Sequence, residues 1–136
     1  MICLDTNVVI AAMNLRPPEV RRRLVAALGD GATVGLPSIV LYELWYGARK
    51  SDRFEVNAQA LTTFLTLDVM PWPFESEDAS EAGDIRAALE RAGTPIGPYD
   101  ILIAAQARRR GASLVTANER EFGRVAGLKT VNWAKP

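Results

Sequence analysis

Three carboxylates stand among apolar residues in this sequence. Asp5 follows the apolar run Met1–Leu4, Glu43 lies within the segment IVLYELW, and Asp100 precedes the segment ILIAA. An isolated buried carboxylate costs several kcal/mol unless it is paired, protonated or bound to a cation. None of the three has an obvious basic partner nearby in the sequence, so we treat them as candidate ligands of a cation.

Each carboxylate taken alone also has a purely structural explanation. Asp5 is placed to cap a helix that begins near Val8, and Asp100 complements the positive end of its own helix. Glu43 has the alternative of pairing with an arginine from another part of the chain. Three separate structural roles are less plausible than one shared site, because all three acids fall where predicted elements meet one edge of a sheet.

Carboxylates that converge in one cleft repel one another, so the cleft must hold either protons or a divalent cation. The sequence contains no histidine and a single cysteine, Cys3, whose place in an apolar run indicates a buried thiol. This composition excludes Ser-His-Asp triads, Cys-His pairs and the usual zinc sites. Oxygen ligands alone suit Mg²⁺ or Mn²⁺, which activate water and neutralise charge on a phosphodiester. The residues therefore favour a metal-dependent phosphodiesterase.

A further polar stretch, Thr116–Phe122, follows a predicted strand. Thr116 and Asn118 are candidates for positioning an attacking water, and Glu121 is a candidate further carboxylate. A turn with Asn118 as the N-cap of a short helix explains the same stretch without any catalytic role. Both explanations stay open at this point.

Hydrophobic periodicity predicts the elements that must position these residues. We expect strands at residues 1–4, 33–36, 69–70, 112–116 and 129–133, and helices at 7–13, 19–28, 39–50, 53–67, 76–91 and 98–110. Ser38 is the expected N-cap of the third helix, and Pro71 and Pro73 are expected to end the third strand. This alternation indicates an α/β fold with a parallel sheet of four to five strands, covered on both faces. Asp5 then lies at the carboxyl end of the first strand, near the point where strand order reverses.

The length of 136 residues fits a single domain, residues 1–136, and the balance of 16 basic and 16 acidic residues excludes a general polycation. No apolar run approaches the ~18 residues of a membrane span. No export signal is visible at the amino terminus. We therefore expect a cytoplasmic protein without a membrane partner.

Four segments of the chain occur in an order that is typical of one family: ICLDTNVVI, LPSIVLYELWYGARKS, IGPYDILIAAQARRRG and LVTANEREFGRVAGLKTVNW. Together they resemble the PIN-domain ribonucleases, in particular the VapC-type toxins of bacterial toxin–antitoxin pairs. The resemblance extends from Met1 to Trp133. It implies a PIN-like three-layer α/β/α sandwich and Mg²⁺-dependent hydrolysis of RNA, with Mn²⁺ as a substitute and a structured RNA such as tRNA or rRNA as the substrate.

The motifs of the family also assign roles to residues of this chain. The first Asp of the family matches Asp5, its Glu on the third helix matches Glu43, and its later Asp matches Asp100; these would bind the metal. The small polar residue after the fourth strand matches Thr116. Many PIN domains have a further Asp two residues later, where this chain has Asn118. That departure leaves Glu121 or Glu119 as the fourth acid, or a single tightly bound metal.

Partners follow from the same resemblance. The family pairs with a VapB-type antitoxin whose tail wraps a groove of the toxin, often placing a basic side chain in the acidic site, and the toxin is expected to be a homodimer. The groove would be lined by apolar residues of the helical hairpin: Leu41, Leu44, Trp45, Phe54, Leu61, Phe64 and Leu65. Packing of these residues onto the sheet is the alternative.

Basic clusters are the candidate contacts for an RNA backbone. Arg49, Lys50 and Arg53 are the strongest, because they follow Glu43 on the same hairpin. Residues 21–23 and 108–110 are arginine runs with the same potential. Solvated helix faces are the alternative explanation for each cluster.

Two other functions remain open. An aspartyl phosphatase also uses an Asp at the end of the first strand, although Asn7 stands where such an enzyme has a second Asp. A noncatalytic module that binds RNA or a protein fits the same fold. Asn118, which replaces an Asp of many PIN domains, is consistent with such a module. Retention of all three acids, Asp5, Glu43 and Asp100, nevertheless argues against the noncatalytic module.

Overall fold

The computed structural model describes residues 1–135, and its centre is a five-stranded parallel sheet. The strands are β1 (Ile2–Leu4), β2 (Val34–Pro37), β3 (Met70–Trp72), β4 (Ser113–Val115) and β5 (Lys129–Val131), in the order β3-β2-β1-β4-β5. Ile2 on the middle strand lies opposite Val34 on one side and Ser113 on the other. The predicted parallel sheet is confirmed, and strand order reverses beside β1 as expected.

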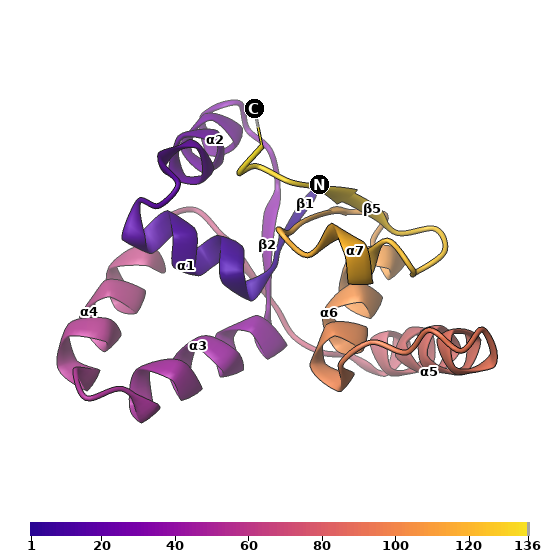
Figure 1. Ribbon diagram of the computed structural model, residues 1–136. Helices are drawn as coiled ribbons and strands as arrows, with labels where there is room; N and C mark the ends of the chain where they lie inside the picture. Colours follow the sequence, from indigo (N-terminus) through magenta and orange to yellow (C-terminus); the bar gives the residue numbers. More distant parts are fainter. Residues whose placement is uncertain (136) are drawn as a thin grey trace.

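Helices cover both faces of this sheet. They are α1 (Thr6–Asn14), α2 (Pro18–Gly29), α3 (Ser38–Lys50), α4 (Phe54–Phe64), α5 (Ser76–Arg91), α6 (Pro98–Arg109) and α7 (Glu119–Phe122). The sheet is seen nearly edge-on in Figure 1, with α1 to α4 on one side and α5 to α7 on the other. The predicted α/β/α sandwich is therefore confirmed, and each predicted element begins and ends within three residues of its observed bounds.

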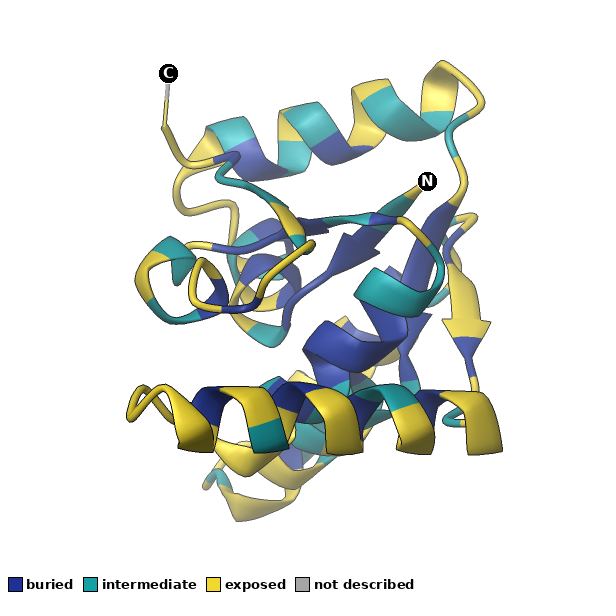
Figure 2. Cartoon of the chain, turned by 90° about the vertical axis from the view of Figure 1, so that its right-hand side faces the viewer, coloured by how far each residue is buried: buried dark blue, intermediate teal, exposed yellow. Residues whose placement is uncertain are grey.

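The core lies between the sheet and the helices that face it. Figure 2 shows the three inner strands and α6 as largely buried, whereas the edge strand β3 is mostly exposed and α5 buries only one of its faces. Burial of α6 was expected from its apolar sequence, and Ile103, Ala104 and Ala105 are completely buried. Cys3 is buried as well, and burial raises the pKa of its thiol, as expected for a structural cysteine. None of the helices in residues 1–135 is both long and hydrophobic enough to span a membrane.

Two predictions about the ends of elements are wrong. β3 continues through Pro71, because β3 is an edge strand and a missing N–H on its outer side costs no ladder hydrogen bond. Ser38 is the first residue of α3 rather than its cap, and its hydroxyl donates to the Trp72 carbonyl at 3.0 Å. The ring of Trp72 lies over Gly35, where an added Cβ would approach its Cε2 to 2.0 Å, so only glycine fits there.

Candidate active site

Asp5 stands at the carboxyl end of the middle strand, where both roles considered for it apply. It is the N-cap of α1, and its Oδ1 accepts a hydrogen bond from the Thr6 amide at 2.8 Å. Its Oδ2 accepts from the hydroxyl of Thr116, just past β4, at 2.7 Å. Asp5 is buried, with only 5% of its surface exposed. Burial, and to a smaller extent the charge of Glu43, raises the pKa of Asp5 even though both hydrogen bonds oppose the rise.

Thr6 connects two of the predicted acids and was missed at the level of the sequence. Its amide binds Asp5, and its hydroxyl donates to Oε1 of Glu43 on α3 at 2.7 Å. The signal was present, because a hydroxyl residue directly follows the Asp at the strand end. Its partner, however, lies 37 residues further along the chain, and only the fold brings the two together.

Asp100 lies in the first turn of α6. Burial is the largest influence on its carboxyl, followed by the negative charges of Asp5, Glu121 and Glu43, and together they raise its pKa to about 6. This mutual influence places the predicted acids in one electrostatic neighbourhood. Thr6 links Asp5 to Glu43, and the charges of both act on Asp100, whereas the role of the three acids as a metal site stays a prediction.

The stretch after β4 holds the acids rather than presenting free polar groups. The Thr116 hydroxyl donates to Asp5 and accepts from the backbone amide of Asn118 at 2.9 Å, so its proton is already used in a hydrogen bond within the chain. Asn118 is the N-cap of α7, as the structural alternative predicted, and its Nδ2 donates to Glu121 Oε2 at 3.2 Å. Glu119 instead pairs with Lys135 at 3.1 Å. Of the two candidates for the fourth acid, only Glu121 acts on the cluster.

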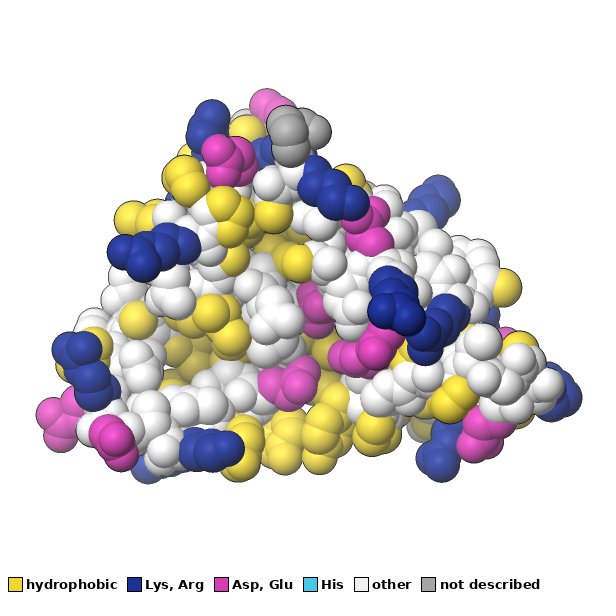
Figure 3. Space-filling view, viewed as in Figure 1, with side chains coloured by type: hydrophobic (Ala, Val, Ile, Leu, Met, Phe, Trp, Pro, Cys, Tyr) yellow, Lys and Arg dark blue, Asp and Glu magenta, His cyan; other side chains and the backbone are white. Residues whose placement is uncertain are grey.

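The cluster lacks a compensating cation. Within residues 1–135, none of the ion pairs involves Asp5, Glu43, Asp100 or Glu121. Figure 3 shows several acidic side chains near the centre of one face, with basic side chains at the periphery and also directly to the right of these acids. As the side chains stand, no three Asp, Glu or Cys residues in that part of the chain are arranged to hold a metal ion. The donor chemistry nevertheless fits a hard divalent cation, because the candidate ligands are all carboxylate oxygens and the pKa values of Asp5 and Asp100 are raised.

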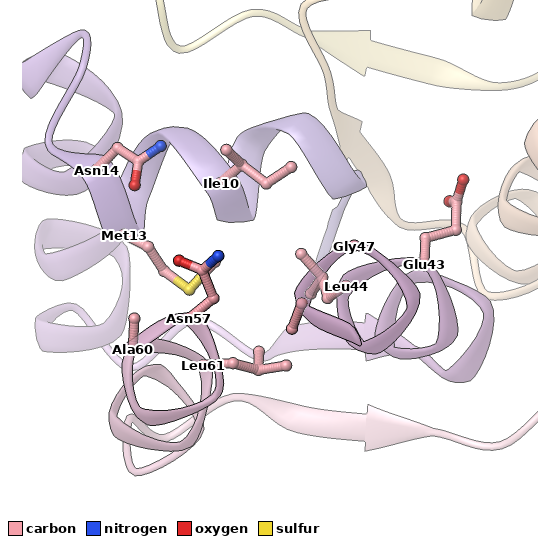
Figure 4. A pocket seen from close by; sticks show the side chains of 10 residues that line it. Ile10, Met13, Asn14, Glu43, Leu44, Gly47, Asn57, Ala60 and Leu61 are labelled. Atoms are coloured by element: carbon pink, nitrogen blue, oxygen red, sulfur yellow. The ribbon is translucent and has the colours of Figure 1, made fainter. Parts of the chain in front are cut away.

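A groove of about 280 Å³ opens beside Glu43, between α1, α3 and α4. Figure 4 shows Ile10 and Met13 on one wall, Leu44 and Leu61 on the other, and Glu43 at one end. Leu44 and Leu61 were predicted to line such a groove. The other hairpin residues were not correctly placed there: Phe64 is fully buried in the core, and Trp45 and Phe54 are half-buried outside the groove.

The basic clusters differ in what they contact. Arg49 and Lys50 lie over aromatic rings of Phe54 and Tyr46, at 4.2 and 5.8 Å from the ring centroids, and both are exposed. Arg53 is also exposed. None of these three makes an ion pair among the described residues, 1–135. They remain candidates for phosphate.

The run 108–110 is neither a solvated face nor a free phosphate site. Arg108 binds Glu81 and Asp84 of α5, and Arg109 and Arg110 both bind Asp78. Its role is to join α6 to α5. The run 21–23 lies on α2, where the first arginine donates to the Ala12 carbonyl and the second lies 3.8 Å from Glu19.

Comparison with known proteins adds evidence from outside the geometry. A family model described as PIN domain matches residues 2–128. The chain is 41% identical to the tRNA(fMet)-specific endonuclease VapC of Shigella flexneri, over 96% of both chains. It is 40% identical to Ribonuclease VapC2 of Haemophilus influenzae, again over 96% of both.

Solved structures give the same picture. The VapBC2 complex of Rickettsia felis, bound to a DNA fragment from its promoter, contains a chain that superposes with a TM-score of 0.91 at 36% identity, covering 98% of this chain and 99% of that one. DNA-bound VapBC from Salmonella typhimurium gives a TM-score of 0.89 at 37% identity over 97% of each chain. Both likenesses span the whole sheet and the edge at which the acids gather.

Proposed function

We propose a function from one premise: this chain belongs to the PIN-domain family, and within it to the VapC ribonucleases. Its activity is endonucleolytic hydrolysis of RNA, and its biological role is that of the toxin in a toxin–antitoxin pair. The observation that carries the proposal is the group of carboxylates at the carboxyl edge of the sheet, which influence one another and form no ion pair with any of residues 1–135. Such a cluster costs folding energy and therefore indicates a ligand.

That ligand is a divalent metal ion, for which we propose Mg²⁺, with Mn²⁺ as a substitute. Asp5, Glu43 and Asp100 would hold it, and Glu121 is the fourth acid of the site. When bound, such an ion supplies Lewis acidity toward the phosphodiester and activates water for attack at phosphorus. Oxygen ligands without histidine or thiolate are the set that these ions prefer.

The remaining residues hold these acids in place. Thr116 fixes one oxygen of Asp5, and Thr6 fixes the other while also binding Glu43. Asn118 binds Glu121 through both its side-chain oxygen and its side-chain nitrogen. We therefore assign Thr6, Thr116 and Asn118 as positioning residues rather than as groups that contact the water.

The substrate we propose is the initiator tRNA. The support is the name of the relatives from Shigella flexneri and Salmonella typhimurium, tRNA(fMet)-specific endonuclease, at 41 and 39% identity over 96% of this chain. Since structured RNA is recognised through its shape and its unpaired nucleotides, the tertiary folding of the tRNA is part of the recognition.

The partner we propose is a VapB-type antitoxin, because the solved relatives are VapBC complexes. The groove beside Glu43 suits an apolar peptide segment that ends near the acids, where a basic side chain would find uncompensated carboxylates. Association into a homodimer and a cytoplasmic location stay predictions from the resemblance.

Cleavage of a panel of purified RNAs tests the function directly. The panel holds initiator tRNA, elongator tRNAs and ribosomal RNA, each incubated with antitoxin-free protein in Mg²⁺, in Mn²⁺ or in EDTA. We expect discrete metal-dependent cuts in initiator tRNA, and a loss of at least about a thousandfold in rate for Asp5→Asn, which keeps the capping oxygen. Cuts that persist in EDTA, or an equally active Asp5→Asn enzyme, would contradict the proposal.

A further inference from the structure

Three exposed tyrosines form one continuous surface beside the acids. Tyr42 and Tyr46 lie one turn apart on α3, Tyr99 lies in the first turn of α6, and their exposed fractions are 50, 56 and 45%. The rings of Tyr42 and Tyr99 meet edge to face with centroids 5.5 Å apart, and their hydroxyls lie 3.4 Å apart. The rings of Tyr42 and Tyr46 are inclined by 24° with centroids 6.5 Å apart. We call these three residues the tyrosine ledge.

The tyrosine ledge begins at the acids themselves. Tyr42 immediately precedes Glu43, and Tyr99 immediately precedes Asp100. The space-filling view shows an apolar strip along the lower edge of the face, directly beneath the central carboxylates (Figure 3). A ligand that lies on the ledge therefore has one end at the site of hydrolysis.

The other end of the ledge is cationic. The ammonium of Lys50 lies 5.8 Å from the ring centroid of Tyr46, and Arg49 precedes it on the same helix. Neither residue pairs with an acid among residues 1–135. Seven residues separate Glu43 from Lys50, so the charge changes from negative to positive over about 10 Å of helix.

From this arrangement we propose that the tyrosine ledge stacks unpaired bases of the RNA next to the bond that is cut, while Arg49 and Lys50 hold the phosphates beyond them. The proposal rests on the ribonuclease function proposed above. An acidic site repels a polyanion, and aromatic rings attract nucleotides through their bases without placing a cation against the carboxylates. The uncompensated cations at the far end favour a polyanion over a second copy of this chain.

Two matched double variants of the full chain test the ledge. Tyr42→Ala with Tyr46→Ala removes both rings, whereas Tyr42→Phe with Tyr46→Phe keeps them and removes only the hydroxyls. Met70→Ala shortens an exposed apolar side chain on the edge strand β3 and serves as the control. For each protein we would measure the Kd of a labelled initiator tRNA transcript in EDTA, the kcat and KM of cleavage in Mn²⁺, and the mass in solution.

We expect the alanine pair to raise Kd and KM about tenfold or more with a smaller change in kcat, because stacking acts on binding. The phenylalanine pair and Met70→Ala should stay within about twofold of wild type. An unchanged Kd in the alanine pair would overturn the proposal. A raised Kd that accompanies a loss of dimeric mass would also overturn it and assign the ledge to contact between copies.

The same measurements separate the two proposals. A wild-type protein that binds initiator tRNA through the tyrosines but cuts no RNA would contradict the ribonuclease proposal and leave the tyrosine ledge as an RNA-binding surface without a role in cleavage. If wild type cuts RNA and the alanine pair cuts it with the same KM, the proposal for the tyrosine ledge is wrong and the ribonuclease proposal is supported.

Discussion

At the N-terminus of α6, Asp100 lies near other carboxylates and forms no ion pair within the described part of the chain, and its pKa rises to about 6. At the C-terminus of the same helix, Arg109 and Arg110 donate to one oxygen of Asp78 on α5 at 2.6 and 2.9 Å. Asp78 has no exposed surface at all, yet its neighbours compensate it. About 14 Å of one helix therefore separates Asp100, whose charge no ion pair neutralises among the described residues, from the two arginines that neutralise Asp78.

The pKa values follow from this contrast. Burial tends to raise the pKa of Asp78, but the hydrogen bonds from Arg109, from the Glu75 amide and from Arg110 outweigh it and hold the pKa below its usual value. Depth of burial alone thus does not identify a functional carboxylate. What distinguishes the acids of the proposed active site is that nothing in the described chain neutralises them, and this is the arrangement that a metal ion would complete.

The largest effect that would sharpen this comparison is expected from Asp78→Asn. The change keeps the size of the side chain but removes the buried charge nearest to two guanidinium groups, which keep only the more exposed Glu75 at 3.6 Å, so we expect the free energy of unfolding to fall by about 3 kcal/mol. Cleavage per folded molecule should stay within about twofold of wild type. Urea denaturation and a cleavage assay on the folded fraction measure both quantities.

A surface pair supplies the control for that variant. Glu19 lies 3.8 Å from Arg22, and both side chains are largely exposed, so Glu19→Gln should change the stability by less than about 0.5 kcal/mol. If Asp78→Asn is as stable as wild type, Asp78 does not have the stabilising role that distinguishes it from Asp100. The distinction also fails if the folded Asp78→Asn protein no longer cleaves RNA.

A smaller effect is expected from the fourth acid. Glu121→Gln keeps a side-chain oxygen for the Asn118 amide but removes the charge that acts on Asp100, so we expect kcat/KM to fall about tenfold. Glu119→Gln is the matched control, because Glu119 pairs with Lys135 instead, and it should stay within about twofold. Equal losses in the two variants would show that the position of Glu121 carries no particular role.

Contacts between residues close together in the sequence were predicted better than contacts between residues far apart in the sequence. The bounds of α5 were predicted to the residue, because Glu75 and Asp78 form a capping box within one turn. The gathering of Asp5, Glu43 and Asp100 followed from the rule that carboxyl ends of parallel strands share an edge.

Contacts between distant residues could not be predicted in the same way. Nothing local links Thr6 to Glu43, which lie 37 residues apart, and no local pattern distinguishes a solvated arginine run from one that binds an acid on another helix. For this reason the neutralisation of Asp78 by Arg109 and Arg110 could not be predicted from the sequence. The side of a helix that faces solvent is equally non-local, which is why the exposed face of Tyr42 and Tyr46 became visible only in the structure.

The smallest effect, and the one with the most informative sign, concerns the stability of the metal-free protein. The pKa of Asp100 is about 6 in the folded state and about 3.9 in an unfolded chain, so the folded state binds the proton more tightly. Ionisation of Asp100 therefore destabilises the fold as pH rises from about 4 through 6, and the penalty is fully present above that range. Because Asp100 is only partly buried and water screens its charge, we expect a penalty of about 1 kcal/mol.

Asp100→Asn removes that penalty, so in EDTA at pH 7.5 the variant should unfold at a higher temperature than wild type, and the two curves should converge near pH 4. Added Mn²⁺ should stabilise wild type and leave Asp100→Asn nearly unchanged, since ligand binding raises stability only where the site is intact. A variant less stable than wild type in EDTA would mean that the Asp100 carboxylate serves the fold, as Asp78 does. A variant that is more stable and inactive would show that this end of α6 gives up stability for a charge that its ligand needs.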